Sequence, residues 1–74
     1  MFNYRASTAD ALTGRETEVL QLVVGGASNR EIAGRTGVSE NTIKFHLKNV
    51  FSKLDVSSRN GAVKVAMQRG LLQS

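Results

Sequence analysis

The stretch that decides the fold is residues 28–54, with the sequence SNREIAGRTGVSENTIKFHLKNVFSKL. Ser28 and Glu31, three residues apart, match a capping box, in which both side chains accept hydrogen bonds from free N–H groups at the start of a helix. Gly37 accepts a positive φ at no steric cost, so it favours the end of that helix. The first part of the stretch therefore predicts a short helix from about residue 29 to 35, followed by a tight turn.

The second part of the stretch predicts a longer helix, from about residue 40 to 54. Ser39 is a good N-cap, and Glu40 suits the positive end of the helix dipole. Apolar residues then recur at steps of three and four. Together with the shorter helix they predict one core, made by Ile32, Ala33, Val38, Ile43, Leu47, Val50, Phe51 and Leu54. The opposite face is basic and rich in hydrogen-bond donors, and it carries Asn41, Lys44, Phe45, Lys48, Asn49 and Ser52.

Helices are also predicted on both sides of this stretch. Thr13 and Glu16 form a second capping box. The helix that follows has apolar positions at Val19, Leu20, Val23 and Val24 and ends at Gly25-Gly26. Ser57 or Ser58 caps a fourth helix that runs to about Arg69, with Gly70 after its end. Leu71 and Leu72 are expected to fold back onto the core. The chain has no proline and no convincing alternating strand. The sequence predicts an all-α fold of four helices over residues 12–74, preceded by a flexible tail or linker remnant, 1–11.

Composition narrows the possible functions. The chain has 74 residues, no cysteine and one histidine, so we expect a single small domain without disulfides, cofactor or metal site. No signal peptide or membrane span is visible, which favours a cytoplasmic location and no membrane partner. The formal net charge is +4. Residues 44–53 hold three lysines, a histidine and no acid, a pattern that favours an anionic partner such as nucleic acid.

The spacing of Ala33, Gly37 and Ile43 is similar to the general helix-turn-helix pattern. The residues around it sharpen the match, and the chain resembles the four-helix (tetrahelical) DNA-binding domain of the LuxR/GerE/NarL family over residues 12 to 72. The segments that carry the resemblance are Leu12-Thr13-x-Arg15-Glu16, Asn29-Arg30-Glu31-Ile32-Ala33, Thr42-Ile43-Lys44-x-His46, Lys53-Leu54, Ser58-Arg59 and Ala62-Val63. The resemblance implies a bacterial transcription regulator, of a kind whose DNA-binding domain is commonly attached to a receiver or small-ligand domain.

The resemblance also implies a DNA-binding surface. The family positions that match Lys44, Phe45 and Lys48 point into the major groove, so these three residues are the predicted base contacts. Helix N-termini and short polar side chains bind phosphate well. The predicted phosphate contacts are Asn29, Ser39, Asn41, Thr42, His46, Asn49 and Lys53. In LuxR-type domains the fourth helix pairs with its symmetry mate, so Val63 and Met67 are predicted at a homodimer interface for binding an inverted repeat.

Several of these residues have a second interpretation. Phe45 either contacts a thymine methyl group or fills an edge of the core. Lys53 either contacts the DNA backbone or pairs with Glu16. Val63 and Met67 are either dimer contacts or ordinary core residues. Arg59, a cation at the unfavourable end of the fourth helix, is expected to form an ion pair with Glu16.

Two residues bear on how the chain is built and what chemistry it could perform. Asp55 stands where the family often has glycine, which predicts a slightly strained or differently built helix end. His46 has no second histidine, cysteine or paired carboxylate near it in sequence, so a structural or phosphate-facing role is expected. No serine has a base partner for nucleophilic catalysis, and an enzyme is not expected.

Alternatives to specific DNA binding remain open. The same four-helix scaffold could be a protein-interaction module that contacts RNA polymerase or a regulatory partner, and contact with polymerase is compatible with DNA binding. A sigma factor's promoter-reading region also uses a helix-turn-helix. The Thr-x-Arg-Glu opening and Lys53-Leu54 favour LuxR.

Overall fold

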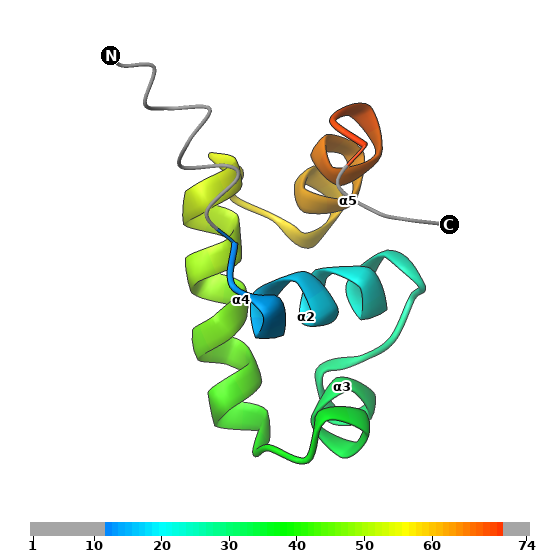
Figure 1. Cartoon of the computed structure of the whole chain (residues 1–74), viewed down its shortest axis with the longest axis vertical. Helices are drawn as coiled ribbons and strands as arrows, with labels where there is room; N and C mark the ends of the chain where they lie inside the picture. The colour runs from blue at the N-terminus through cyan, green and yellow to red at the C-terminus, as the bar shows by residue number, and fades with distance from the viewer. Residues whose placement is uncertain (1–11, 71–74) are drawn as a thin grey trace.

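The computed structural model describes residues 12–70, which form four helices and no strand. They are α2 (Gly14–Val24), α3 (Asn29–Thr36), α4 (Glu40–Leu54) and α5 (Arg59–Gln68). The longest helix, α4, packs against each of the other three, and α2 also contacts α3 and α5 (Figure 1). The all-α fold predicted from the sequence is confirmed, and α4 has the predicted bounds. The predicted tail, residues 1–11, lies outside the described residues.

Each helix begins where a hydroxyl side chain caps it. Thr13 and Ser28 form complete capping boxes with Glu16 and Glu31, as predicted. The hydroxyl of Ser39 accepts a hydrogen bond from the Thr42 N–H at 3.1 Å. Of the two serines considered for the last helix, Ser58 is the cap. The spacing of a hydroxyl residue three positions before its N–H partner therefore located every helix start among residues 12–70.

The two residues that end α3 and α4 both adopt left-handed backbone conformations. Gly37 has φ 76°, and its N–H donates to the carbonyl of Ala33 at 2.9 Å. Asp55 has φ 59° and is the only residue other than glycine with a positive φ in the described part of the chain. Because a Cβ crowds the neighbouring carbonyl in this conformation, the predicted strain at the end of α4 is located at Asp55.

The core has two adjoining clusters, and α2 and α4 contribute to both. One cluster surrounds the helix-turn-helix and consists of Val19, Val23, Ile32, Ala33, Ile43 and Leu47. The other lies against α5 and consists of Leu20, Val50, Leu54, Ala62 and Ala66. The half-buried ring of Phe51 packs on both. Six of the eight core residues predicted from the central stretch are buried, while Val38 and Phe51 are half-buried at the edge.

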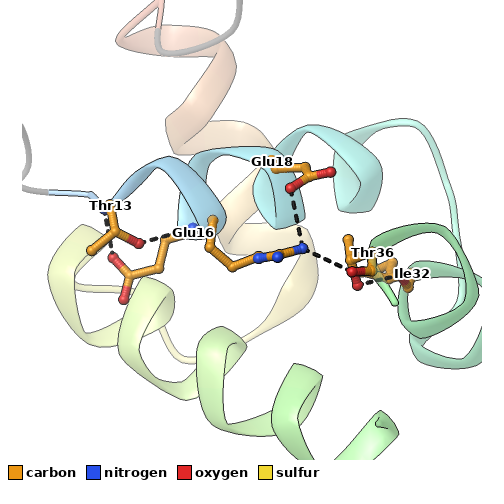
Figure 2. Close-up of polar contacts among 6 residues, drawn as sticks. Thr13, Glu16, Glu18, Ile32 and Thr36 are labelled. Carbon is orange, nitrogen blue, oxygen red and sulfur yellow. Dashed lines mark hydrogen bonds and ion pairs between the residues drawn. The ribbon is translucent and has the colours of Figure 1, made fainter. Parts of the chain in front are cut away.

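A polar contact joins α2 to the end of α3. The guanidinium of Arg15 donates to the Thr36 carbonyl at 3.0 Å and pairs with Glu18 at 3.4 Å. The hydroxyl of Thr36 donates in turn to the Ile32 carbonyl at 2.8 Å, and Figure 2 shows Thr36 and Ile32 together at this junction. A cation at a helix C-terminus is favourable, so Arg15 ties α2 to the end of α3, next to the turn into α4.

Two further findings complete the fold. Leu71 and Leu72, which were expected to fold back onto the core, lie outside the described residues. None of the helices in residues 12–70 has the length and apolar character that a membrane span requires.

Candidate nucleic-acid interface

The exposed face of α4 is the clearest candidate surface. Ile43, Leu47, Val50 and Leu54 bury one stripe of the helix, and this burial fixes how α4 is rotated about its axis. The side chains on the opposite face are therefore held outward. Lys44, Phe45 and Lys48 are all exposed, so the structure brings the three predicted base contacts together on one turn of one helix.

Phe45 lies on the solvent side of this face. Its side chain is 61% exposed, which is not the environment of a residue that fills an edge of the core. Its ring centroid lies 6.1 Å from that of His46, with the two rings tilted by 59°. A large apolar ring left in water between two lysines is available for an apolar contact, and a thymine methyl group in the major groove offers one.

The N-terminus of α4 presents hydroxyl and amide groups. The Ser39 hydroxyl caps the helix and lies 3.1 Å from the Thr42 hydroxyl, toward which it donates. Asn41 is exposed and Thr42 half-buried. The proton of the Thr42 hydroxyl is thus left to donate elsewhere, and both side chains lie where the helix dipole favours an anion.

Lys53 pairs with Glu16, which is the second of the two roles considered for it. Its ammonium group lies 2.7 Å from Oε1 of Glu16, and the same oxygen accepts the Thr13 N–H at 3.0 Å. Glu16 is only 4% exposed. Burial raises the pKa of its carboxyl group, but hydrogen bonds from Lys53 and Thr13 and the charges of Lys53 and His46 outweigh it, so the pKa lies below its ordinary value. The pair therefore ties the C-terminal half of α4 to the start of α2.

The predicted ion pair between Arg59 and Glu16 is wrong, because Glu16 is bound to Lys53. The guanidinium of Arg59 reaches instead to the start of α3, where it donates to the Ala27 carbonyl at 3.2 Å and to Oδ1 of Asn29. Its unfavourable place in α5 was the only sequence signal that Arg59 had a partner elsewhere. The identity of that partner depends on how α5 folds back over the rest of the chain, which no local pattern encodes.

Asn29 and Arg59, joined by this hydrogen bond, lie at a surface groove. An open groove of about 380 Å³ is bordered by Lys44, Leu47, Lys48 and Phe51 of α4, and by Asn29 and Arg59. Its lining combines the apolar side chains of Leu47 and Phe51 with cations from α4 and α5. The half-buried His46 and Asn49 lie on α4 outside this lining. The structure thus places the predicted phosphate contact Asn29 in the same groove as Lys44 and Lys48, two of the predicted base contacts, although Asn29 belongs to a different helix.

The two residues predicted at a dimer interface differ in their surroundings. Met67 is 67% exposed on α5. Val63 is half-buried and packs against the cluster formed by α2, α3 and α4. Met67 is therefore available to a partner, whereas Val63 contributes to the core as well.

The family model described as bacterial regulatory proteins, luxR family, matches residues 10–66. The probable transcriptional regulatory protein SgaR of Hyphomicrobium methylovorum is 52% identical over 54 residues, which is 73% of this chain and 26% of SgaR. The response regulator protein VraR of Staphylococcus aureus is 44% identical over 69 residues, which is 93% of this chain and 33% of VraR.

Solved structures agree with the sequence comparison. The response regulator ChrA of a heme-sensing two-component system superposes with a TM-score of 0.81 at 44% identity, over 84% of this chain and 31% of ChrA. The response regulator StyR gives 0.80 at 38% identity, over 89% of this chain and 33% of StyR. The chain spans about a third or less of each of these relatives. It belongs to the luxR family of bacterial regulatory proteins, as one of its DNA-binding helix-turn-helix domains.

Proposed function

We propose that this domain binds double-stranded DNA sequence-specifically, with α4 in the major groove, and that it does so as part of a bacterial transcription regulator. The observation that carries the proposal is the exposed cluster of Lys44, Phe45 and Lys48, held outward by the buried stripe of α4. Lysine ammonium groups donate to the acceptor edge of guanine, and Phe45 offers apolar contact to thymine. The cluster thus combines charge with groups able to distinguish bases.

Phosphate contacts supply the affinity in this proposal. Asn29, Ser39, Asn41, Thr42, His46 and Asn49 are distributed around the base-reading cluster, at helix starts or on α4. Lys53 also lies on α4, but we expect a smaller contribution from it because its ammonium group is bound to Glu16. Cations that neutralise phosphates release counterions, so binding should weaken steeply as salt is added.

We further propose that two copies pair through α5 when bound to DNA, with Met67 and the exposed part of Val63 in the contact. The exposure of Met67 supports this. Two-fold pairing would place one α4 in each half of an inverted repeat. The apolar area involved is small, so the dimer is expected to form on DNA rather than in free solution.

The test is selection of bound duplexes from a random DNA library at near-physiological salt. Enrichment of an inverted repeat is the expected result and would support both specific binding and a two-fold dimer. Enrichment of a single half-site would support specific binding and contradict the dimer. Salt-sensitive binding without any enrichment would contradict sequence specificity in this chain.

A matched pair of variants separates DNA contact through the α4 cluster from a general effect of net charge. Replacing Lys44 and Lys48 together by glutamine should abolish DNA binding while leaving the fold intact, since both side chains are exposed. The control replaces two other exposed cations, Lys64 of α5 and Arg69 directly after this helix, by glutamine. Equal loss of binding in both double variants would show that net charge matters rather than the α4 cluster.

A further inference from the structure

Arg59 occupies a place that the stability of α5 does not explain. It is the first residue of α5, directly after the cap Ser58, and the first turn of this helix holds no acidic residue. The N-terminus of a helix carries partial positive charge, so a guanidinium group there is unfavourable for the helix itself. Its role must therefore lie in contacts outside α5.

Those contacts are made with the start of α3. The half-buried guanidinium of Arg59 bridges the Ala27 carbonyl, at 3.2 Å, and Oδ1 of Asn29. The bridge fixes which way the Asn29 amide is turned. A guanidinium group has only donors, so the amide atom that faces it must be the oxygen. The amide nitrogen, Nδ2, is consequently turned away from Arg59.

The Nδ2 group of Asn29 remains available as a donor. None of the hydrogen bonds within residues 12–70 uses it. No buried side-chain nitrogen or oxygen in this part of the chain lacks a partner, so Nδ2 is open to solvent. Asn29 and Arg59 border the same groove as Lys44 and Lys48. An amide donor and two ammonium groups along one groove complement the phosphates of a nucleic-acid backbone.

We propose that Arg59 is a positioning residue for DNA binding, which holds the Asn29 amide so that Nδ2 donates to a backbone phosphate beside Lys44 and Lys48. This inference rests on the proposed function. In it Arg59 does not touch the DNA. Its two-point bridge removes the rotational freedom that Asn29 would otherwise lose on binding, so the hydrogen bond to phosphate forms at a lower entropic cost.

The test is a double-mutant cycle on binding to a short duplex of random sequence, since phosphate contacts do not depend on sequence. The variants are Asn29→Ala, Arg59→Gln and the two combined, and affinity is measured by fluorescence anisotropy over a series of salt concentrations. Each single variant should lose affinity about fivefold, as expected for one hydrogen bond. The double variant should lose no more than either single one, because Arg59 acts only through Asn29.

The salt dependence of binding separates a positioning role of Arg59 from its direct contact with phosphate. Arg59→Gln should leave the slope of log affinity against log salt equal to that of the control Arg69→Gln, which removes the same charge from the exposed far end of α5. A slope lower by about one, with losses that multiply in the double variant, would show that Arg59 itself contacts phosphate and would overturn the proposal.

Arg59→Lys is a second variant, included in case the glutamine variant fails to fold. It keeps the charge at the start of α5 but replaces the planar fork by a single ammonium group, which lacks the two-point bridge. It should therefore bind as weakly as Asn29→Ala. Unaltered binding by Arg59→Lys or Arg59→Gln would overturn the role of Arg59 alone. Failure of the unaltered chain to bind any duplex would overturn the proposed function itself.

Discussion

At the scale of single residues, Phe45 is the side chain whose environment most directly indicates a binding role. It is 61% exposed, so the core gains little from it. We expect Phe45→Ala to change the free energy of unfolding by no more than about 0.5 kcal/mol. The free energy of binding to the selected DNA site should become less favourable by about 1 kcal/mol, the contribution of roughly one buried methyl group.

Two measurements check this prediction for Phe45. Urea unfolding gives the change in stability, and a titration with the selected duplex and its uracil-substituted form, which lacks the thymine methyl group, gives the contact. The unaltered chain should distinguish the two duplexes and Phe45→Ala should not. A large loss of stability in the variant would show instead that the ring has a structural role.

Glu16 is a second residue whose environment leads to a prediction. Glu16→Gln removes the charge opposite Lys53, whose side chain is 27% exposed. We expect a loss of about 1–3 kcal/mol in the free energy of unfolding at neutral pH, less than for a fully buried pair. The control is Glu18→Gln, which breaks the exposed pair with Arg15 and should cost at most about 1 kcal/mol.

The contribution of Glu16 should also depend on pH. Its pKa is lowered in the folded state, so the unfolded chain binds the proton more readily. The stability it confers is therefore complete above the ordinary glutamate pKa of about 4.3 and is lost as the pH falls through the lowered value. Denaturant unfolding from neutral to acidic pH should show the gap between the unaltered chain and Glu16→Gln closing. A gap of constant size would contradict this assignment.

Short-range residue patterns predicted more of the structure than long-range ones. Thr13 and Ser28 cap their helices because their hydroxyl groups and the glutamates three residues on lie within one turn, a geometry that the sequence encodes directly. The partner of Arg59 depends instead on how two helices are placed in space. The charge of Glu16 made it a reasonable candidate for the partner of Arg59, but Glu16 forms its ion pair with Lys53.

At the scale of elements, α4 is a helix whose bounds follow from its sequence and whose last turn is followed by a strained residue. Its apolar period predicted both its bounds and its buried stripe, because one helical period specifies one face. Asp55 ends it in the left-handed conformation at φ 59°. Its carboxylate also lies at the negative end of the helix dipole. Conformation and charge thus both disfavour aspartate at this position.

We expect Asp55→Gly to raise the free energy of unfolding by about 0.5–1 kcal/mol. Relief of about 1–2 kcal/mol of left-handed strain exceeds the roughly 0.5–1 kcal/mol that glycine costs in chain entropy. Asp55→Asn keeps a Cβ while removing the charge, so it isolates the part due to the dipole. Urea unfolding of both variants is the measurement. If both are less stable than the unaltered chain, the carboxylate of Asp55 must make a stabilising contact that outweighs its strain.

At the scale of the whole molecule, the division of the core explains why α4 is a suitable reading element. The cluster around Ile43 holds its first half against α2 and α3, and the cluster around Val50 holds its second half against α5. The Glu16–Lys53 pair adds a polar tie to α2. With one face held along its length, α4 presents Lys44, Phe45 and Lys48 on a rigid support. The sequence predicted these three as one face, but the groove that Lys44 and Lys48 share with Asn29 exists only in the packed molecule.

The proposed dimer leads to a prediction at this same scale, because it concerns the molecule and its copy rather than any internal contact. Met67 is 67% exposed, so replacing it should leave the free energy of unfolding within about 0.5 kcal/mol of its original value. Met67→Gln introduces a polar amide of similar length without a charge that would itself act on DNA. If α5 pairs across a two-fold axis, this variant should bind a single half-site normally and lose cooperative binding to an inverted repeat. Met67→Leu, which keeps the apolar surface, should retain it. Gel-shift titrations on duplexes with one and two half-sites distinguish these cases, and retained cooperativity in Met67→Gln would place the dimer contact elsewhere on the domain.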